Sequence, residues 1–228
     1  MSVALDSIVP WGRSLDEYVR MFALTLGDLR GKILDCGGGP ASFNAELSKR
    51  GGRVVSCDPI YEFEASDIAR RIEETAPRIL ESTRRKLDNF IWTELGSPDR
   101  LAQLRRATMR DFLEDFPSGL AEGRYRVAEL PELPFCDGDF EMALCSHFLF
   151  TYPNLLDAKF HVDCIRELCR VAREARIFPL VPQFGAERSE RLKPVLNQLA
   201  RSGYGCEIVR VPYQFQKGGN EMLRVSHR

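Results

Sequence analysis

Apolar runs alternate with amphipathic stretches along most of the chain, and this alternation predicts a parallel α/β sheet. The apolar runs predict strands over 32–36, 53–58, 124–130, 139–150, 175–181, 206–211 and 221–227. Between the first two runs, residues 42–50 carry a helical pattern that Gly51 and Gly52 bring to an end. A strand, a helix and a strand in succession form the repeating unit of a parallel sheet. The run over 139–150 is almost continuously apolar, so we expect that strand to be covered on both faces.

Three further stretches have the three- and four-residue spacing of amphipathic helices. The first, 14–29, begins with Ser14 and Glu17 in the spacing of a capping box. Its predicted buried face consists of Leu15, Val19, Phe22, Leu26 and Leu29. The other two helices are predicted over 157–173 and 190–203. The buried stripe of the helix over 157–173 is expected to hold His161, Ile165, Leu168, Cys169 and Ala172.

The stretch from 61 to 116 is long, highly charged and helical in pattern, with expected breaks at Pro77 and at 96–98. Its basic and acidic residues nearly balance, which indicates solvated helix faces rather than a phosphate-binding surface. We therefore predict a helical insertion between the second and third strands. Trp92 and Phe112 within it are expected to pack internally. We expect the insertion to act as a lid over a small-molecule acceptor.

Composition and charge leave an ordinary globular protein as the expected class. The 228 residues are 44% hydrophobic and 29% charged, with 32 basic and 33 acidic side chains and a net charge of −1. This balance gives no strong nucleic-acid signal and no attraction to an anionic membrane. The first residues lack the basic stretch of a signal peptide, and no apolar run reaches the roughly 18 residues of a membrane span. A single cytoplasmic domain over 1–228 is therefore expected.

The seven cysteines and three histidines do not predict a metal site. No two cysteines have C-x-x-C spacing, and no histidine clusters with them. Metal ligands usually come in such tight pairs. Most of the cysteines lie in apolar runs and are expected to be small core residues.

The stretch "ILDCGGGPASF", residues 33–43, predicts a cofactor site. Gly37, Gly38 and Gly39 follow a strand, and Asp35 precedes them by two residues. Glycine can adopt backbone angles closed to other residues, and it lets a ligand approach the main chain. A glycine-rich turn between a strand and a helix lies at the carboxyl edge of a parallel sheet, where cofactors bind.

A dinucleotide is one candidate for this cofactor. Its fingerprint is G-x-G-x-x-G with an acid about 20 residues further on. Here Ser42 stands at the third glycine position, whereas Asp58 fits the distant acid. The carboxylate of Asp35 would repel a pyrophosphate at the turn, and no hydride-transfer site is evident. An NAD-dependent oxidoreductase is thus the less favoured alternative.

The same residues resemble the first motif of class I S-adenosylmethionine (SAM)-dependent methyltransferases, D-x-G-x-G-x-G. Asp35, Gly37 and Gly39 match it, with Ala41 in place of the last glycine. A second match is the order of Glu129 and "LPF" at 133–135 before the fourth strand. The resemblance extends over most of the chain outside 61–116. It implies a Rossmann-like α/β fold, with a seven-stranded mixed sheet and helices on both faces.

The resemblance also implies roles for residues at the strand ends. Asp35 and the three glycines would hold the methionine end of SAM. Asp58, followed by Pro59, would bind the ribose hydroxyls. Glu129 would bind the adenine amine, and Leu130 would supply a backbone amide. For each acid a structural role is the alternative, such as a helix cap, the start of a turn or an exposed strand end.

Residues beside the reacting methyl group are expected at the carboxyl end of the fourth strand and on the first helix. Ser146 and His147 lie in the later part of the apolar run that predicts the fourth strand. His147 could act as a general base, because its ordinary pKa is near neutrality; a histidine bonded at the core edge is the alternative. Arg13, Tyr18 and Met21 lie on the helix that family members fold over the cofactor, although capping and packing explain them nearly as well. The pair 218–219 suits a hairpin turn on the active-site side.

The function implied is methyl transfer from SAM to an unidentified small molecule. One alternative is a non-catalytic regulatory protein that binds SAM or S-adenosylhomocysteine. Another is a methyltransferase acting on RNA or protein. The oligomeric state is not predicted.

Overall fold

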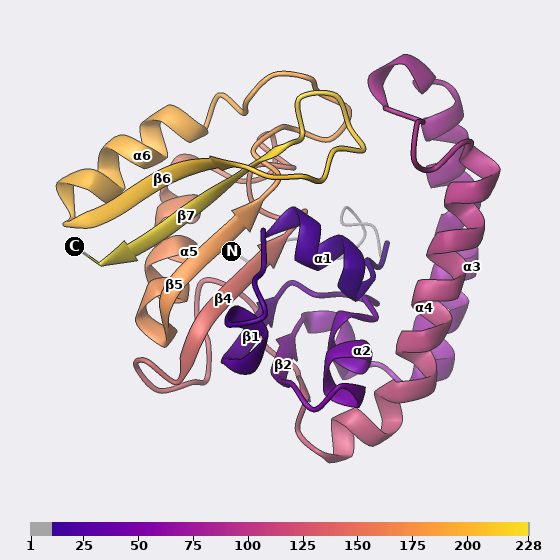
Figure 1. The fold of residues 1–228 in the computed structure, drawn as a ribbon, viewed down its shortest axis with the longest axis horizontal. Coiled ribbons are helices and arrows are strands. Elements are labelled where there is room, and N and C mark those ends of the chain that lie inside the picture. The colour runs from indigo at the N-terminus through magenta and orange to yellow at the C-terminus, as the bar shows by residue number, and fades with distance from the viewer. Residues whose placement is uncertain (1–10, 228) are drawn as a thin grey trace.

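A computed structural model describes residues 11–227, so the first residues, which bear on the targeting expectation, lie outside the described part. Its seven strands form one sheet in the order β3-β2-β1-β4-β5-β7-β6 (Figure 1). The strands are β1 Lys32–Cys36, β2 Arg53–Cys57, β3 Tyr125–Arg126, β4 Phe140–Ser146, β5 Ala172–Phe178, β6 Tyr204–Arg210 and β7 Glu221–His227. β7 runs antiparallel to both of its neighbours, whereas the other pairs are parallel. The predicted seven-stranded mixed sheet is confirmed.

Helices cover both faces of this sheet. They are α1 Leu15–Met21, α2 Phe43–Lys49, α3 Ala65–Arg84, α4 Pro98–Ala121, α5 Ala158–Val171 and α6 Leu192–Arg201. Short 3-10 turns lie at Asp28–Arg30, Pro59–Glu62 and Leu87–Asn89. Side chains of α1 and α2 share one hydrophobic cluster, and those of α5 and α6 share another.

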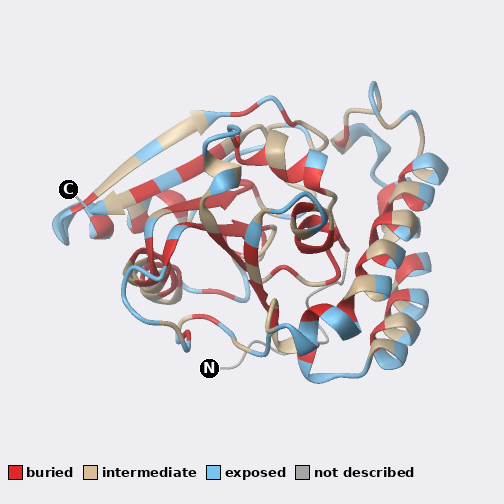
Figure 2. Ribbon diagram, turned by 60° about the horizontal axis from the view of Figure 1, so that its bottom comes forward, coloured by how far each residue is buried: buried red, intermediate tan, exposed pale blue. Residues whose placement is uncertain are grey.

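The alternation of side chains along a strand divides the core between the two faces. Ile33 belongs to the cluster under α1 and α2, whereas the next residue, Leu34, belongs to the cluster under α5 and α6. Met142 and Ala143 in β4 divide in the same way. Figure 2 shows the buried residues concentrated in the sheet and on the inner sides of its helices. A strand buried on both faces reads as a continuous apolar run, as expected for β4.

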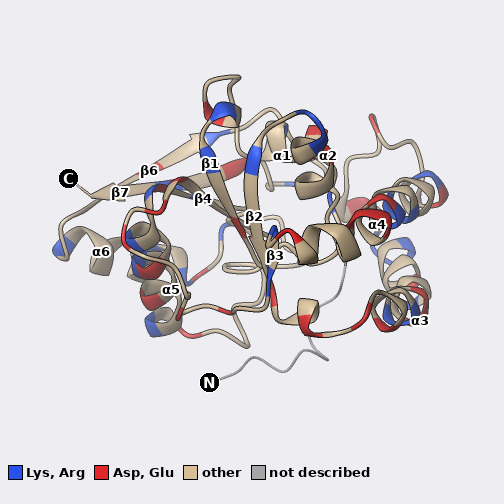
Figure 3. Ribbon diagram, turned by 90° about the horizontal axis from the view of Figure 1, so that it is seen from below, with Lys and Arg blue, Asp and Glu red and all other residues tan. Residues whose placement is uncertain are grey.

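The predicted insertion is the pair α3 and α4, which stand side by side next to α1 and α2 (Figure 1). It has its own cluster of buried rings, in which Tyr61 packs against Phe112, Phe116 and Tyr125. Phe112 is fully buried in this cluster, so the internal packing predicted for it is confirmed. Trp92 is half-buried and packs against Phe90 and against Phe215 of the β6–β7 loop, outside the insertion. Charges of both signs are distributed along the two helices (Figure 3).

One of the two breaks predicted in the insertion is wrong. Ser97 caps α4 by accepting a hydrogen bond from the Arg100 amide, so the break at 96–98 is confirmed. Pro77, however, lies inside α3, and the insertion continues to Ala121. Pro77 is exposed, so water can satisfy the carbonyl group that its missing N–H leaves free. The buried stripe of α3 continues past Pro77 and holds the helix together.

The helix predicted over 14–29 is too long. The capping box of Ser14 and Glu17 is present, but α1 ends at Met21 and Leu26 is 79% exposed. After the helix, Ala23 has a φ of +47°, and Arg176 of β5 donates a hydrogen bond to the carbonyl oxygen of Phe22 at 2.8 Å. A partner from a distant strand thus replaces the next helical turn.

The third strand is shorter than the predicted 124–130. Only Tyr125 and Arg126 pair with β2. The rest of the run leaves the sheet: Val127 is exposed, and Glu129 and Leu130 reach a cavity described below.

Among the described residues, no helix has the length and apolar character needed to span a bilayer.

Candidate active site

A cavity of about 130 Å³, called here the first cavity, lies where β1, β2 and β4 end. Residues that end or directly follow each of these strands line it: 36–41 at the end of β1, 58–60 after β2 and 146–148 at the end of β4. The remaining lining residues come from the N-terminal segment, the start of the insertion and the loop after β3: Trp11, Arg13, Tyr18, Phe63, Arg71, Ala128, Glu129 and Leu130. The carboxyl ends of parallel strands therefore converge here, as expected for a ligand site in an α/β sheet.

The glycine turn has a backbone that requires glycine. Gly37 and Gly39 have φ angles of +69° and +52°, in the region that other residues rarely adopt. A Cβ on Gly38 would overlap the carboxylate of Asp35. The amide of Gly39 donates to Asp58 at 2.9 Å, and its carbonyl oxygen accepts from the Tyr61 hydroxyl at 2.8 Å. The turn is thus fixed between the ends of β1 and β2.

Asp58 combines the two roles that the sequence left open. One carboxylate oxygen accepts from the Gly39 amide and the other from the Ile60 amide, each at 2.9 Å, so Asp58 does begin the 3-10 turn with Pro59. It also lines the cavity. Each carboxylate oxygen can accept a further hydrogen bond. Burial raises the pKa of Asp58 to about 6 despite the two amide donors.

Asp35, expected to contact the cofactor, lies beneath the glycine turn and is not among the residues that line the first cavity. Its side chain is 1% exposed, and its two oxygens accept from the hydroxyls of Tyr18 and Ser56, each at 2.9 Å. Burial raises the pKa of Asp35 to about 7, although these two donors act in the opposite direction. Asp35 therefore positions Tyr18, which does line the cavity.

Met21 is the other predicted site residue that the structure keeps away from the cavity. It is 0% exposed and belongs to the hydrophobic cluster under α1 and α2. Its long apolar side chain packs into this core, and it is not among the residues that line the cavity. All the other predicted site residues line the first cavity: Arg13, Tyr18, Gly37, Gly38, Gly39, Asp58, Pro59, Glu129, Leu130, Ser146 and His147.

His147 is held in an unusual backbone conformation directly after β4. Its φ is +52°, and its amide donates to the carbonyl oxygen of Phe178 at 2.6 Å. Such strain in a residue other than glycine is frequent at functional sites. Its Nδ1 lies 2.8 Å from the Ser146 hydroxyl oxygen. Burial, with the positive charges of Arg13 and Arg105, holds the pKa of His147 well below its ordinary value, so the ring is neutral at pH 7.

A second cavity of about 120 Å³ meets the first, and sequence analysis did not predict it. Trp11, Arg13 and His147 line both cavities. The other walls of the second cavity come from four separate parts of the chain. These are the insertion (Ile79, Thr83, Phe90, Leu101), the segment after β4 (Thr151, Tyr152), the segment that ends β5 and follows it (Phe178, Pro179, Val181, Gln183, Phe184) and the β6–β7 loop (Tyr213, Phe215, Gln216, Gly219). Only the glycine pair 218–219 gave a local signal for this region.

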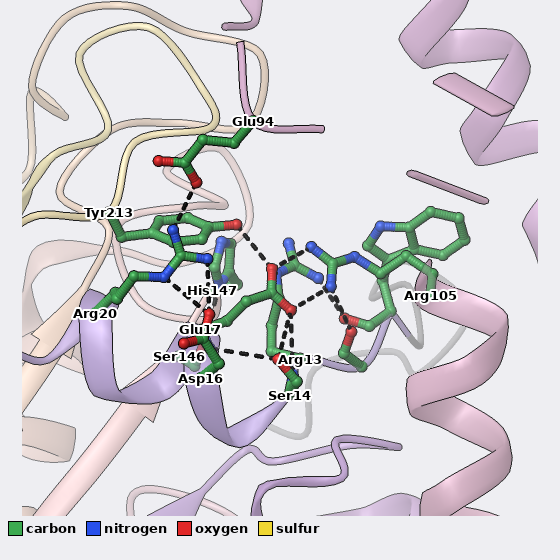
Figure 4. Close-up of polar contacts among 12 residues, drawn as sticks. Arg13, Ser14, Asp16, Glu17, Arg20, Glu94, Arg105, Ser146, His147 and Tyr213 are labelled. Carbon is green, nitrogen blue, oxygen red and sulfur yellow. Dashed lines mark hydrogen bonds and ion pairs between the residues drawn. The ribbon is translucent and has the colours of Figure 1, made fainter. Parts of the chain in front are cut away.

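A buried charge cluster lies beside the wall that the two cavities share (Figure 4). The carboxylate of Glu17 accepts from Arg105 Nη1 at 2.5 Å and Nη2 at 2.6 Å, and from the Tyr213 hydroxyl at 3.0 Å. Burial opposes the ionisation of Glu17, but Arg105 outweighs burial and lowers its pKa well below the ordinary value. Arg105 is 0% exposed and belongs to α4, so this cluster ties the insertion to α1 and to the β6–β7 loop.

Arg13 adds a second guanidinium to this cluster without a second carboxylate. Its side chain is 11% exposed, and its Nε lies 3.9 Å from the Glu17 carboxylate. Its Nη1 donates to the Trp11 carbonyl oxygen at 2.6 Å, whereas its buried Nε has no hydrogen-bond partner in the described part of the chain. The shared wall therefore carries an excess of positive charge. Within 11–227, no three His, Cys, Asp or Glu side chains are arranged to hold a metal ion.

The sheet order and the antiparallel β7 define a Rossmann-like α/β protein with the class I methyltransferase fold. No protein-family model matches the chain. The chain is 36% identical over 224 residues to the uncharacterized protein MJ0045 of Methanocaldococcus jannaschii, and the match covers 96% of each protein. The chain therefore belongs to the same family as MJ0045.

Two methyl-transfer and biosynthetic proteins are among the solved structures with a similar arrangement. The magnesium protoporphyrin IX methyltransferase of Synechocystis PCC 6803 with bound SAM is 14% identical, with a TM-score of 0.47 and coverage of 94% of this chain and 78% of that one. The pyocyanin biosynthetic protein PhzM is 14% identical with a TM-score of 0.46; 94% of this chain is covered, but only 54% of PhzM. The chain thus spans about half the length of PhzM. Likeness at this level concerns the fold alone.

Proposed function

We propose that this protein is a SAM-dependent methyltransferase that binds SAM in the first cavity and a small-molecule acceptor in the second. The observation that carries the proposal is the wall that the two cavities share. Trp11, Arg13 and His147 line both, so ligands in the two cavities would meet there. Methyl transfer needs this arrangement, because its rate depends mainly on holding the acceptor atom in line with the methyl group.

The residues of the first cavity fit SAM. The glycine turn leaves backbone exposed where side chains would fill the space, and Asp58 retains lone pairs for hydroxyl groups of a ribose. Glu129 and Leu130 are the candidates for the adenine, on the loop after β3. Tyr18 would contact the amino-acid end. When bound, the sulfonium of SAM supplies an already activated methyl group.

The chain's own residues would align the acceptor and exclude water. His147 lies at the shared wall, where its neutral ring can accept a hydrogen bond from an acceptor hydroxyl. Two nearby guanidinium groups oppose its protonation. We therefore expect His147 to orient the acceptor rather than to store its proton.

The alternatives fit less well. In dinucleotide-binding sheets the classic strand order is 3-2-1-4-5-6, built from two halves, whereas here antiparallel β7 lies between β5 and β6. A protein that only senses SAM would have no need of a second cavity at the reacting end. Mixed charges on the insertion and the net charge of −1 give no support to an RNA substrate.

Thermal unfolding with ligands tests this proposal. A ligand that binds only the folded state raises the melting temperature. We expect SAM and S-adenosylhomocysteine to raise it and NAD to leave it unchanged. A rise with NAD alone would show that the first cavity holds a dinucleotide and that the proposal is wrong.

A further inference from the structure

The second cavity has walls that select the chemistry of its ligand. Most of its lining side chains are aromatic or aliphatic. Its only charged lining residue is Arg13, and no carboxylate lines it among the described residues. A cationic acceptor would therefore lose its hydration and meet a positive charge, whereas an anionic oxygen would find a partner.

The aromatic part of the lining forms a fixed roof. Phe90 of the insertion stacks on Phe215 of the β6–β7 loop, with centroids 4.6 Å apart and planes at 18°. Phe184 meets Phe90 edge-on at 6.0 Å. The backbone joins the same segments: the Ile91 amide donates to the Phe215 carbonyl oxygen at 2.7 Å, and the Lys217 amide donates to that of Asn89 at 2.9 Å. Walls of fixed rings favour a planar aromatic ligand.

The polar part of the lining is incompletely satisfied. Thr151 is 7% exposed, and its hydroxyl has no hydrogen-bond partner among the described residues. Buried polar groups without partners are rare. The Nε of Arg13 is a second buried polar atom in this lining without a hydrogen-bond partner among the described residues.

On the basis of the proposed function, we propose that the acceptor is a small phenol. Its ring lies between the aromatic walls, and its oxygen lies at the shared wall beside Arg13 and His147. The phenol releases its proton to solvent and is held as the phenolate by Arg13. The phenolate oxygen then gains the methyl group, and the electron pair of the broken S–CH₃ bond stays on the sulfur of the donor, leaving a neutral thioether and a methyl ether. Before the transfer, the negative charge of the phenolate neutralises the surplus positive charge of the Arg13–Glu17–Arg105 cluster.

The test uses 4-nitrophenol as the probe, because its phenol and phenolate forms absorb at different wavelengths. The protein is first saturated with S-adenosylhomocysteine, so that only the second cavity is free, and the probe is titrated by absorbance between pH 5 and pH 9. We expect binding to lower the apparent pKa of the probe by about one unit or more, as an adjacent opposite charge does. 4-Nitroanisole and 4-nitrobenzylamine, which have the ring without an acidic oxygen, should bind at least tenfold more weakly.

Variants of Arg13 test whether this guanidinium causes the change in the pKa of the probe. In Arg13→Met, Glu17 still has Arg105 as its partner, so we expect the variant to fold and to bind the probe at least tenfold more weakly with no change in its pKa. Arg13→Lys should retain part of the pKa change. An unchanged spectrum on binding to the wild type, or equal binding of the amine, would overturn the assignment, as would 4-nitrobenzoate binding more tightly than 4-nitrophenol.

The design separates this inference from the proposed function. Calorimetry on the same protein first measures S-adenosylhomocysteine binding. No binding at that step contradicts the proposed function itself. Binding of S-adenosylhomocysteine without binding of 4-nitrophenol contradicts only the phenol assignment.

Discussion

The two cavities share one wall but are built in different ways. The first is made largely from backbone and from short segments that directly follow strands, so its residues are close in sequence to recognisable turns. The second is made from side chains of four segments that only the folded chain brings together. Local sequence motifs are therefore enough to predict the position of the expected cofactor site, whereas the position of the acceptor site depends on tertiary packing around the insertion.

The largest expected effect comes from the cluster that joins the two cavities. Arg105→Met leaves the buried carboxylate of Glu17 without its main partner, which typically costs about 3–5 kcal/mol. We expect urea unfolding to show a loss of this size and both cavities to lose ligand binding. The double variant Glu17→Gln with Arg105→Met should recover much of the stability. A single variant as stable as the wild type would show that the cluster does not tie the insertion to α1.

Asp35, beneath the first cavity, should make stability depend on pH. Its pKa is raised from 3.8 to about 7, so between these values the folded state holds a proton that the unfolded state has lost. Stability from this group is therefore fully present below pH 3.8 and is lost as pH rises through 7. The amide side chain of the Asp35→Asn variant does not ionise, so the variant does not lose stability in this way. The melting temperature of the variant, minus that of the wild type at the same pH, should therefore increase from pH 4 to pH 8. Between pH 4 and pH 8 the stability of the variant relative to the wild type should rise by about 4 kcal/mol; a constant difference in stability across this range would contradict the burial argument.

Gly38→Ala distinguishes the backbone-built cavity from an ordinary turn. The added Cβ would overlap the Asp35 carboxylate, so we expect a stability loss of about 1–3 kcal/mol and at least tenfold weaker SAM binding in calorimetry. Gly27→Ala is the matched control. Its φ is −65° and its Cβ would have no contact closer than 3.4 Å, so neither quantity should change appreciably. Equal effects of the two variants would mean that the turn has no special role.

Phe90→Leu should affect the second cavity alone. The change removes the ring that stacks on Phe215 but keeps an apolar side chain. A ring contact of this kind typically contributes about 1 kcal/mol. We expect 4-nitrophenol to bind several-fold more weakly and S-adenosylhomocysteine to bind as in the wild type. Leu87→Ala, an exposed residue of the same loop, serves as control. Weaker binding of both ligands would show that the cavities are not separable.

Thr151→Val should give the smallest effect. The hydroxyl has no protein partner to lose, so we expect the free energy of unfolding to stay the same or to rise slightly. Binding of 4-nitrophenol should weaken by only a few fold. A clear loss of stability in urea unfolding would mean that the hydroxyl is satisfied within the protein after all.

The sequence predicted the elements that local patterns control. β1 and β7 agree with their predicted bounds, and α2, α5 and α6 agree within a few residues. Prediction failed where a distant contact decides the outcome. Arg176 of β5 ends α1 early by binding the Phe22 carbonyl, and the packed stripe of α3 carries that helix through Pro77. Neither effect can be read from the local pattern.

The same distinction applies to the candidate site. The glycine turn and Asp58 lie where their strands predicted, because the carboxyl ends of parallel strands must meet at one edge. The motif did not reveal that Asp35 points beneath the turn, since a strand residue can face either side of the sheet and its hydroxyl partners are 17 and 21 residues away. Arg105 was missed because it lies on a helix with many exposed arginines, and only its burial against Glu17 distinguishes it.

The most direct test of the central claim is calorimetric titration with SAM and NAD of the wild type, Asp58→Ala and Glu114→Ala. Glu114 is an exposed acid on α4, and its removal controls for the change in net charge. The account predicts that SAM binds the wild type and Glu114→Ala alike, that Asp58→Ala binds it at least tenfold more weakly, and that NAD binds none of them. Tight binding of NAD, or SAM binding that Asp58→Ala leaves unchanged, would contradict the assignment of the first cavity to SAM.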